Sequence, residues 1–482
     1  FTKRSRVDFF SIFKRKFRKG TKTSQLPVLS FEGASIKESR LFQFYTLLKS
    51  YYFQILKDFP FIILTLIGFI VLAFSLYQVD KQMAYHIHPL SYIVANEILG
   101  AVSMSAYFIS LFYAAELIFW EKKHHVHEIN DSINIPTIII YSAKCLSLLL
   151  IILTLTVIGL IIGIMTQLMK GNNEINLLVY FHTLFTFEIG YYFYMILIIF
   201  FIQSTLNNRL IGYGVIVLLY ILFIVLVSKF NWLDHLYMPF TSPSVQYSEM
   251  NGYGHFVPRY FFVVSYWICI SLFLSVVGYL FYSRGTDNSF QARKLEALNR
   301  LNFKTKLSAI LTLSLSIILG IVIYYNTRIL NKMKDPLEDE KLSASFEKKY
   351  SKYKDKIQPR ITSLYSKVDL FPEKRELYVD SEMILQNKSN QTISEILVNY
   401  HDEIDFKDFK FSKEGKWTLE DKEMFFSIYK LEEPLKPGEE CRLTFNSSYT
   451  KKGFPMMGFF NRVAENGTFV SLDTLLVSIG YD

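Results

Sequence analysis

Apolar residues in this chain are concentrated in seven long blocks, and short polar segments separate most of them. A helix needs about 20 predominantly apolar residues to cross the roughly 30 Å hydrocarbon core of a bilayer. The pattern therefore predicts an α-helical polytopic membrane protein. The predicted spans are Phe59–Gln78, Leu90–Trp120, Thr137–Leu168, Leu177–Leu206, Leu210–Ser228, Phe261–Tyr282 and Leu307–Tyr325.

The residues before the first span, 1–58, form a basic segment with two parts. In Ile36–Lys57, leucine and aromatic residues recur at helical spacing, so we expect an amphipathic helix lying at the membrane interface. Phe1–Gly20 mixes Lys and Arg with Phe. That composition fits either a helix on an anionic membrane surface or a solvated basic linker.

The residues after the last span have an ordinary polar composition. Residues 326–367 read as a polar linker, with a charged helix that ends by Pro359. From Val368 onward, apolar and polar residues alternate between turn signals, so residues 368–482 are predicted to form an antiparallel β domain. The end at Asp482 has no closing helix, and we expect the chain to be a segment of a longer protein.

Composition and charge fix the predicted location. The chain is 51% hydrophobic and only 20% charged, which is too little charge to cover a soluble protein of this length. The net charge of +9 clusters in loops, which indicates contact with membrane lipid and no nucleic-acid partner. Lys and Arg in residues 1–58, 121–135 and the linker 283–306 place those segments in the cytoplasm. An odd number of spans then puts the β domain on the outer side of the membrane.

A charged, His-rich stretch from Glu116 to Pro136 interrupts the apolar pattern between the second and third spans. It admits two interpretations, a metal site or a helix presented to a partner. His-rich tracts can bind metals, but no Cys or second cluster completes a site, and His127 does not begin an H-E-x-x-H motif. We therefore predict no metal here. The candidate partner-facing residues are Glu121, Lys122, Lys123, His124, His125, His127 and Glu128.

Ionisable residues inside predicted spans are costly, so each is a functional candidate. Glu116 and Lys144 each lie about one turn from the cytoplasmic side of consecutive spans, and we expect them to pair. Glu188 lies deeper in the fourth span. It fits either a translocation path or a hydrogen bond to a neighbouring helix.

The outer segment Phe230–Tyr260 is aromatic, contains Pro and Gly, and carries few charges. Such a composition is typical of short half-inserted helices at the outer interface, although an ordinary aromatic-rich loop would also fit. The candidate residues of this outer re-entrant loop are Trp232, Tyr247, Glu249, Asn251, Gly252 and Tyr253.

The predicted order of elements resembles the permease subunits of type-two ATP-binding-cassette exporters. The resemblance covers the interfacial helix, a short cytoplasmic helix within residues 121–135, and the outer segment before the last span of a six-helix unit, 59–282. Two stretches resemble, more narrowly, a bacterial group in which such a permease is fused to a zinc aminopeptidase: AELIFWEKKHHVHEINDSINIP and QYSEMNGYGHF. Two later stretches resemble the N-terminal β domain of aminopeptidase N: VDLFPEKRELYVDSEMILQNKSNQTISEILVNY and FVSLDTLLVSIGYD.

The resemblance implies a membrane permease component of an ATP-driven exporter, located in a bacterial inner membrane with its β domain in the periplasm. A separate ATPase subunit would bind ATP and dock at residues 121–135, since this chain has no G-x-x-x-x-G-K-[ST] loop. A second permease half or a homodimer would complete the pathway, and the seventh span, 307–325, would be an extra tether.

The resemblance also leaves other functions open. The zinc motif would lie beyond Asp482, so no catalytic residue, metal or cofactor is assigned to this chain. One alternative is a membrane anchor and N-terminal part of a zinc aminopeptidase without transport activity. A scaffold whose β domain binds a partner is a third. The transported substrate is not predicted.

Overall fold

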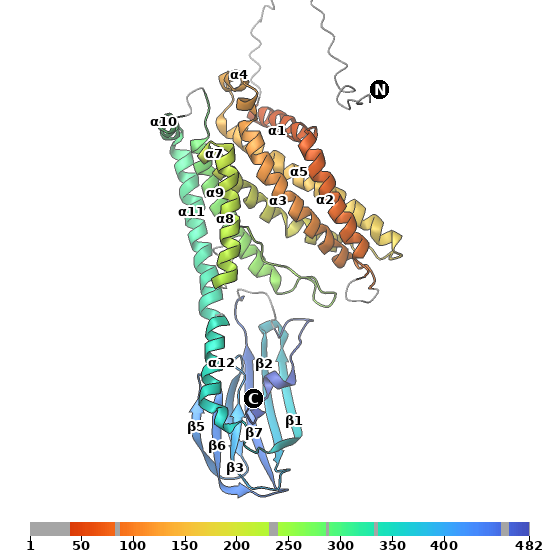
Figure 1. The fold of residues 1–482 in the computed structure, drawn as a ribbon, viewed down its shortest axis with the longest axis vertical. Helices are drawn as coiled ribbons and strands as arrows, with labels where there is room; N and C mark the ends of the chain where they lie inside the picture. The colour runs from red at the N-terminus through yellow and green to blue at the C-terminus, as the bar shows by residue number, and fades with distance from the viewer. Residues whose placement is uncertain are drawn as a thin grey trace, which may run out of the picture.

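The structure is a computed structural model that describes residues 39–81, 87–230, 240–285, 289–331, 336–454 and 462–481. A bundle of long apolar helices occupies one end of the molecule, and a β domain occupies the other (Figure 1). This order confirms the predicted helical region followed by an antiparallel β domain. The basic N-terminal segment up to residue 38 lies outside the described residues.

Within the described part of the chain, seven helical segments are long and apolar enough to cross a membrane. The protein is therefore a membrane-embedded protein. The segments are α2 (Phe59–Gln78), α3 (Ser91–Lys123), α5 (Thr137–Met169), the composite span Leu177–Leu206, α8 (Arg209–Phe230), α9 (Phe256–Phe281) and α11 with its π-helical extension (Phe303–Leu330). These spans lie where the apolar blocks predict them, with ends that shift by a few residues.

Three shorter helices lie at the end of the bundle opposite the β domain (Figure 1): α1 (Arg40–Leu56), α4 (His127–Ser132) and α10 (Phe290–Arg300). α1 begins where the Ser39 hydroxyl accepts a hydrogen bond from the backbone N–H of Phe42, at 3.2 Å, as a helix N-cap does. Leu41, Phe42 and Tyr45 of α1 are exposed, which suits the predicted position at a membrane surface.

The fourth span is not a continuous α-helix. It begins as α6 (Leu177–Phe181), continues as the π-helix η3 (His182–Thr186), turns at residues 187–188, and resumes as α7 (Ile189–Leu206). Glu188 is the residue immediately before α7. Interrupted helices inside a membrane often mark functional positions.

The helices pack closely where small residues allow it. At Gly163 of α5, a Cβ atom would lie 2.4 Å from the Cδ1 atom of Ile98 in α3, so any larger residue there would displace the Ile98 side chain. Small residues at helix contacts are the usual way for membrane helices to approach each other. α3 and α7 lie centrally, since α3 contacts α2, α5 and α7, and α7 contacts α9.

The β domain consists of two four-stranded antiparallel sheets, with strand orders β1-β2-β7-β4 and β5-β6-β3-β8. Their inner faces share one apolar core, to which Met383 of β2 and Val398 of β3 belong. The first strand begins at Arg360, earlier than the predicted start at Val368. The strands are β1 (Arg360–Phe371), β2 (Glu376–Gln386), β3 (Ile393–Asn399), β4 (Asp405–Phe411), β5 (Gly415–Asp421), β6 (Phe426–Leu435), β7 (Glu440–Thr450) and β8 (Ser478–Ile479), with the short helix α13 (Leu472–Leu475).

The β domain lies beside the helix ends that are far from α4 (Figure 1), and Asn331 and Phe454 provide two of the contacts between them. The amide of Asn331, just after the π-helix η4 (Tyr325–Leu330), donates to the carbonyl of Lys452 at 2.8 Å. The ring of Phe454 stacks on that of Phe262 in α9, with centroids 5.4 Å apart. A further helix, α12 (Pro336–Tyr350), packs on the second sheet through aromatic rings.

Candidate functional site

A buried charged cluster lies near the end of the bundle that carries α1, α4 and α10. The Lys144 ammonium of α5 donates to the Glu121 carboxylate of α3 and to the Tyr282 hydroxyl, each at 2.9 Å. The Tyr51 hydroxyl of α1 donates to the same carboxylate at 3.3 Å. Lys144 has no exposed side-chain area. We call these four residues the buried charged cluster.

The cluster is a demanding arrangement in an apolar bundle, because an unpaired buried ammonium costs several kcal/mol. Glu121 supplies the opposite charge and the two tyrosines supply further hydrogen bonds. Burial raises the pKa of Tyr51 and of Tyr282 above the ordinary value, so both remain neutral phenols. The cluster therefore connects α1, α3, α5 and the end of α9 through a single fixed charge pair.

The expected pair between Glu116 and Lys144 is wrong. Glu116 accepts instead from Lys123 at 2.9 Å and from Arg209 at the start of α8 at 3.0 Å. The reason is helical geometry: Glu116 and Glu121 are five residues apart, which places them about 140° apart around α3. Glu121 faces α5 and Glu116 faces α8.

The end of α3 differs from the predicted partner-facing helix. Residues 121–123 are the last turn of α3, and Glu121 is directed into the bundle. Lys122 donates to Asn207 at 3.2 Å and to Ser283 at 2.5 Å, so it joins α3 to the α7–α8 turn and to the end of α9. These two residues are structural contacts of the bundle and not an exposed docking surface.

The exposed part of the stretch begins after α3. Lys123, His124, His125 and Glu128 are exposed, and His127 is half-buried. The ring of His124 lies on that of Trp120, with centroids 4.5 Å apart. Among the residues that the structure describes, no three His, Cys, Asp or Glu side chains come together in a way that could hold a metal ion.

The short helix α4 is fastened to the connection between α9 and α10. Asp131 accepts from the backbone N–H of Gly285 at 2.8 Å and lies 3.5 Å from the Arg284 guanidinium. Arg284 also donates to the carbonyls of Ile133 and Ile135, at 2.5 and 2.6 Å. Displacement of α4 would therefore move the end of α9 as well as α3 and α5.

Two arginines of α10 donate hydrogen bonds to backbone carbonyl groups at the C-terminal ends of other helices, at the same end of the bundle. Arg293 is buried and donates to the carbonyls of Ser204, Thr205 and Phe281. Arg300 donates to the carbonyl of Tyr282 at 2.5 Å. From the sequence, the positive charges of Arg284, Arg293 and Arg300 indicated only the side of the membrane on which this segment lies. Their position just after an apolar helix was a usable signal, since basic residues there can bind the last carbonyls.

Glu188 belongs to a second polar region, in the interrupted fourth span. It is half-buried before α7, and no described hydrogen bond or ion pair links it to Glu116 or Lys144. The hydroxyl of Tyr253, from the outer segment, donates to the carbonyl of Val179 at 3.1 Å and lies 2.9 Å from the hydroxyl of Thr183. The outer segment therefore packs on the π-helix beside Glu188.

Residues 240–255 of the outer segment contain no helix, so the predicted half-inserted helices are wrong for that part. Ser248 and Gly252 exchange two backbone hydrogen bonds of 2.8 Å in a tight turn, and Gly252 has a φ of +63°. Tyr247 packs on Tyr253, Glu249 is exposed, and Asn251 approaches Gly467 of the β domain. Trp232 lies outside the described residues.

Comparison of the chain with protein-family models, with curated proteins and with solved structures gives no match. The class of protein is therefore defined by the fold alone: a membrane-embedded helical bundle followed by an antiparallel β domain.

Proposed function

We propose that this chain is the permease component of an ATP-driven exporter and works with a separate ATPase subunit. The observation that carries the proposal is the position of α4. This short helix projects at the end of the bundle opposite the β domain, and its neighbours connect it to three spans (Figure 1). A force applied to α4 would reach α3 directly, α5 through Glu121 and Lys144, and α9 through Asp131 and Arg284.

The proposed docking surface is the exposed face of α4 and the turns beside it. Ile129 and Ile133 are 68% and 48% exposed, and His125 and Glu128 are exposed beside them. Apolar side chains surrounded by charges suit a protein partner, in which the apolar residues provide affinity and the charges provide orientation. The enrichment of Lys and Arg at this end supports a cytoplasmic position, where an ATPase subunit would be found.

Substitutions on α4 should distinguish loss of ATPase binding from loss of coupling between the bound ATPase and the membrane spans. The full chain would be co-purified with a candidate ATP-binding-cassette ATPase subunit, and ATPase stimulation would be measured. Glu128→Lys combined with Ile129→Asp should abolish co-purification, because both residues are exposed on α4. Asp131→Asn should preserve co-purification but reduce stimulation, because it weakens the contact with Arg284 and Gly285. Lys388→Glu, in an exposed turn of the β domain, is the matched control and should change neither.

Unchanged co-purification and stimulation in the α4 double variant would contradict the proposal. Glu121 is unsuitable for this test, since its loss would leave Lys144 buried without its carboxylate. The alternative function, a membrane anchor of a zinc aminopeptidase, predicts a different result. The full-length protein would then contain zinc and show aminopeptidase activity that deletion of the ATPase leaves unaffected.

A further inference from the structure

A charged cavity of about 330 Å³ lies between the end of α1, the start of α2 and the last three turns of α3. It carries charges of both signs close together. Its lining includes Gln54, Lys57, Asp58, Tyr113, Glu116 and Lys123.

Two neighbouring groups in this cavity remain available to a ligand. Asp58 accepts one hydrogen bond at Oδ2, from the Tyr113 hydroxyl at 2.6 Å, and among the described residues its other oxygen has no partner. The Lys57 side chain is exposed and, within the same described part, makes no hydrogen bond or ion pair. Both oxygens of Glu116 are already paired. The cavity therefore offers one cation and one anion on consecutive residues.

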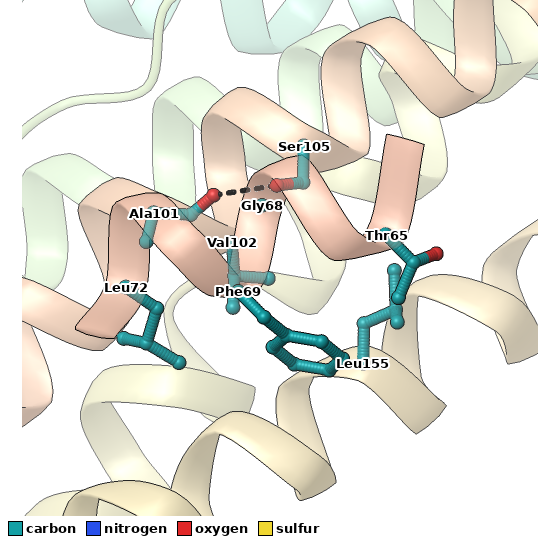
Figure 2. A pocket seen from close by; sticks show the side chains of 8 residues that line it. All are labelled: Thr65, Gly68, Phe69, Leu72, Ala101, Val102, Ser105 and Leu155. Atoms are coloured by element: carbon teal, nitrogen blue, oxygen red, sulfur yellow. Dashed lines mark hydrogen bonds between the residues drawn. The ribbon is translucent and has the colours of Figure 1, made fainter. Parts of the chain in front are cut away.

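A second hollow follows the same helices deeper into the bundle. It is a notch of about 20 Å³ between α2, α3 and α5, lined mainly by apolar groups (Figure 2). At Gly68 a Cβ atom would lie 2.3 Å from the Ser105 Oγ atom, and Ser105 in turn donates to the carbonyl of Ala101. Thr65 and Leu72, on the notch, follow Asp58 by about 10 and 20 Å along α2 at 1.5 Å per residue. The notch itself has room for about one water molecule. The outer face of α2 at the same depth is apolar and exposed, at Ile62, Leu66 and Ile70, and this is the depth of an acyl chain below its head group.

We propose that the charged cavity between α1, α2 and α3 binds a phospholipid whose head group carries both a phosphate and a primary ammonium, with its acyl chains along the exposed apolar face of α2. Lys57 and the Gln54 amide hold the phosphate, and the free oxygen of Asp58 accepts from the ammonium. Asp58 and Glu116 would repel a head group that carries only negative charge. A quaternary ammonium has no N–H to donate to Asp58. The exposed apolar residues of α1, at the membrane surface, place the cavity at head-group level.

Lipid retention tests this site without reference to transport. The full chain would be extracted from a membrane with equal amounts of phosphatidylethanolamine, phosphatidylglycerol and phosphatidylcholine. The lipid kept after purification in detergent would be counted by mass spectrometry. We expect retained phosphatidylethanolamine to exceed the other two. Lys57→Glu and Asp58→Asn should each lower it about tenfold, the size of losing one charge-assisted hydrogen bond.

Lys49→Glu is the matched control, since Lys49 is an exposed lysine of α1 that does not line this cavity. It should leave retention unchanged. Equal retention of the three lipids, a preference for phosphatidylglycerol, or retention unaffected by Lys57→Glu would overturn the proposal. Lys57 is decisive among the variants, because its exposed side chain makes no contact on which folding depends.

Discussion

Lys144 illustrates how a single residue sets requirements on several helices. Its ammonium is completely buried, and its stability depends on Glu121 from α3 and Tyr282 beyond α9. By contrast, the side chain of Lys123, which pairs with Glu116, is 54% exposed, and solvent screens the charge of Lys123. The two lysines therefore differ in energetic importance although both form ion pairs of 2.9 Å.

Substitution of these lysines should separate the two cases. Lys144→Met should destabilise the chain by about 3 to 5 kcal/mol, because it leaves Glu121 charged and half-buried. Lys123→Ala should cost about 1 kcal/mol or less. The double variant Glu121→Gln with Lys144→Met should recover most of the loss, since neither charge remains. Unfolding in detergent checks this, and equal effects of Lys144→Met and Lys123→Ala would contradict it.

Asp421 gives a pH-dependent contact between α12 and the β domain. Lys349 and the Tyr350 hydroxyl each bond to its carboxylate at 2.6 Å. Those bonds lower the pKa of Asp421 from 3.8 to about 2. The folded state therefore favours the ionised carboxylate, and this contribution is complete above pH 3.8 and is lost as the pH falls toward 2.

The measurement is the thermal midpoint of the wild type and of Asp421→Asn between pH 5 and pH 2. The wild type should be more stable at pH 5, and the difference should shrink as the pH falls. A constant difference across that range would show that the carboxylate charge does not support α12.

The sequence predicted residue types at the candidate site better than it predicted their partners. Glu116 and Lys144 were recognised because ionisable residues in an apolar run are rare. Their partners depend on the rotation of each helix about its own axis. A hydropathy pattern indicates how deep a residue lies in the membrane but not which neighbouring helix it faces. Glu121 was placed on the surface for the same reason.

At the scale of elements, the long apolar spans were the most predictable part, since 20 apolar residues in succession have few other uses. The interruption of the fourth span at η3 was not predicted, because no Pro marks it. The outer segment depends on tertiary contacts with α7 and α9, such as the bond from Tyr194 to the carbonyl of Thr241.

The contact between η4 and the β domain depends on one glycine. Gly453 has a φ of +67°, and a Cβ atom there would lie 2.1 Å from the Asn326 Oδ1 atom. Gly438, in the β6–β7 turn, has a φ of +81° with open space around it. Gly438→Ala should cost about 1 kcal/mol from backbone strain, and Gly453→Ala about 2 kcal/mol or more, because a clash is added.

Hydrogen exchange of the η4 amides together with thermal unfolding checks this pair. Faster exchange confined to Gly453→Ala would show that the turn holds the β domain against the membrane helices. Identical behaviour of the two variants would contradict the predicted clash.

At the scale of the whole molecule, α4 and the β domain lie at opposite ends (Figure 1). The proposed function requires the α4 end to face the cytoplasm and the β domain to lie on the other side of the membrane. The three native cysteines, Cys145, Cys269 and Cys441, are buried and should give little background in labelling.

Two exposed positions test this orientation. A membrane-impermeant maleimide should label Lys388→Cys, in the β domain, in cells with a permeable outer membrane. It should label Ser132→Cys, on α4, only after the inner membrane is opened. The reverse pattern would place the ATPase-facing end outside and would remove the topological basis of the proposed function.

The last turn of α3 also restricts how this chain can evolve. Glu121, Lys122 and Lys123 are consecutive, yet their side chains bond to α5, to the α7–α8 turn and to Glu116. Each added or deleted residue rotates everything beyond it by about 100°. A single insertion between Glu116 and Glu121 would therefore misplace all three contacts at once, whereas a point substitution removes only one. Homologous chains should vary in residue identity along α3 while keeping its length fixed between Glu116 and Lys123.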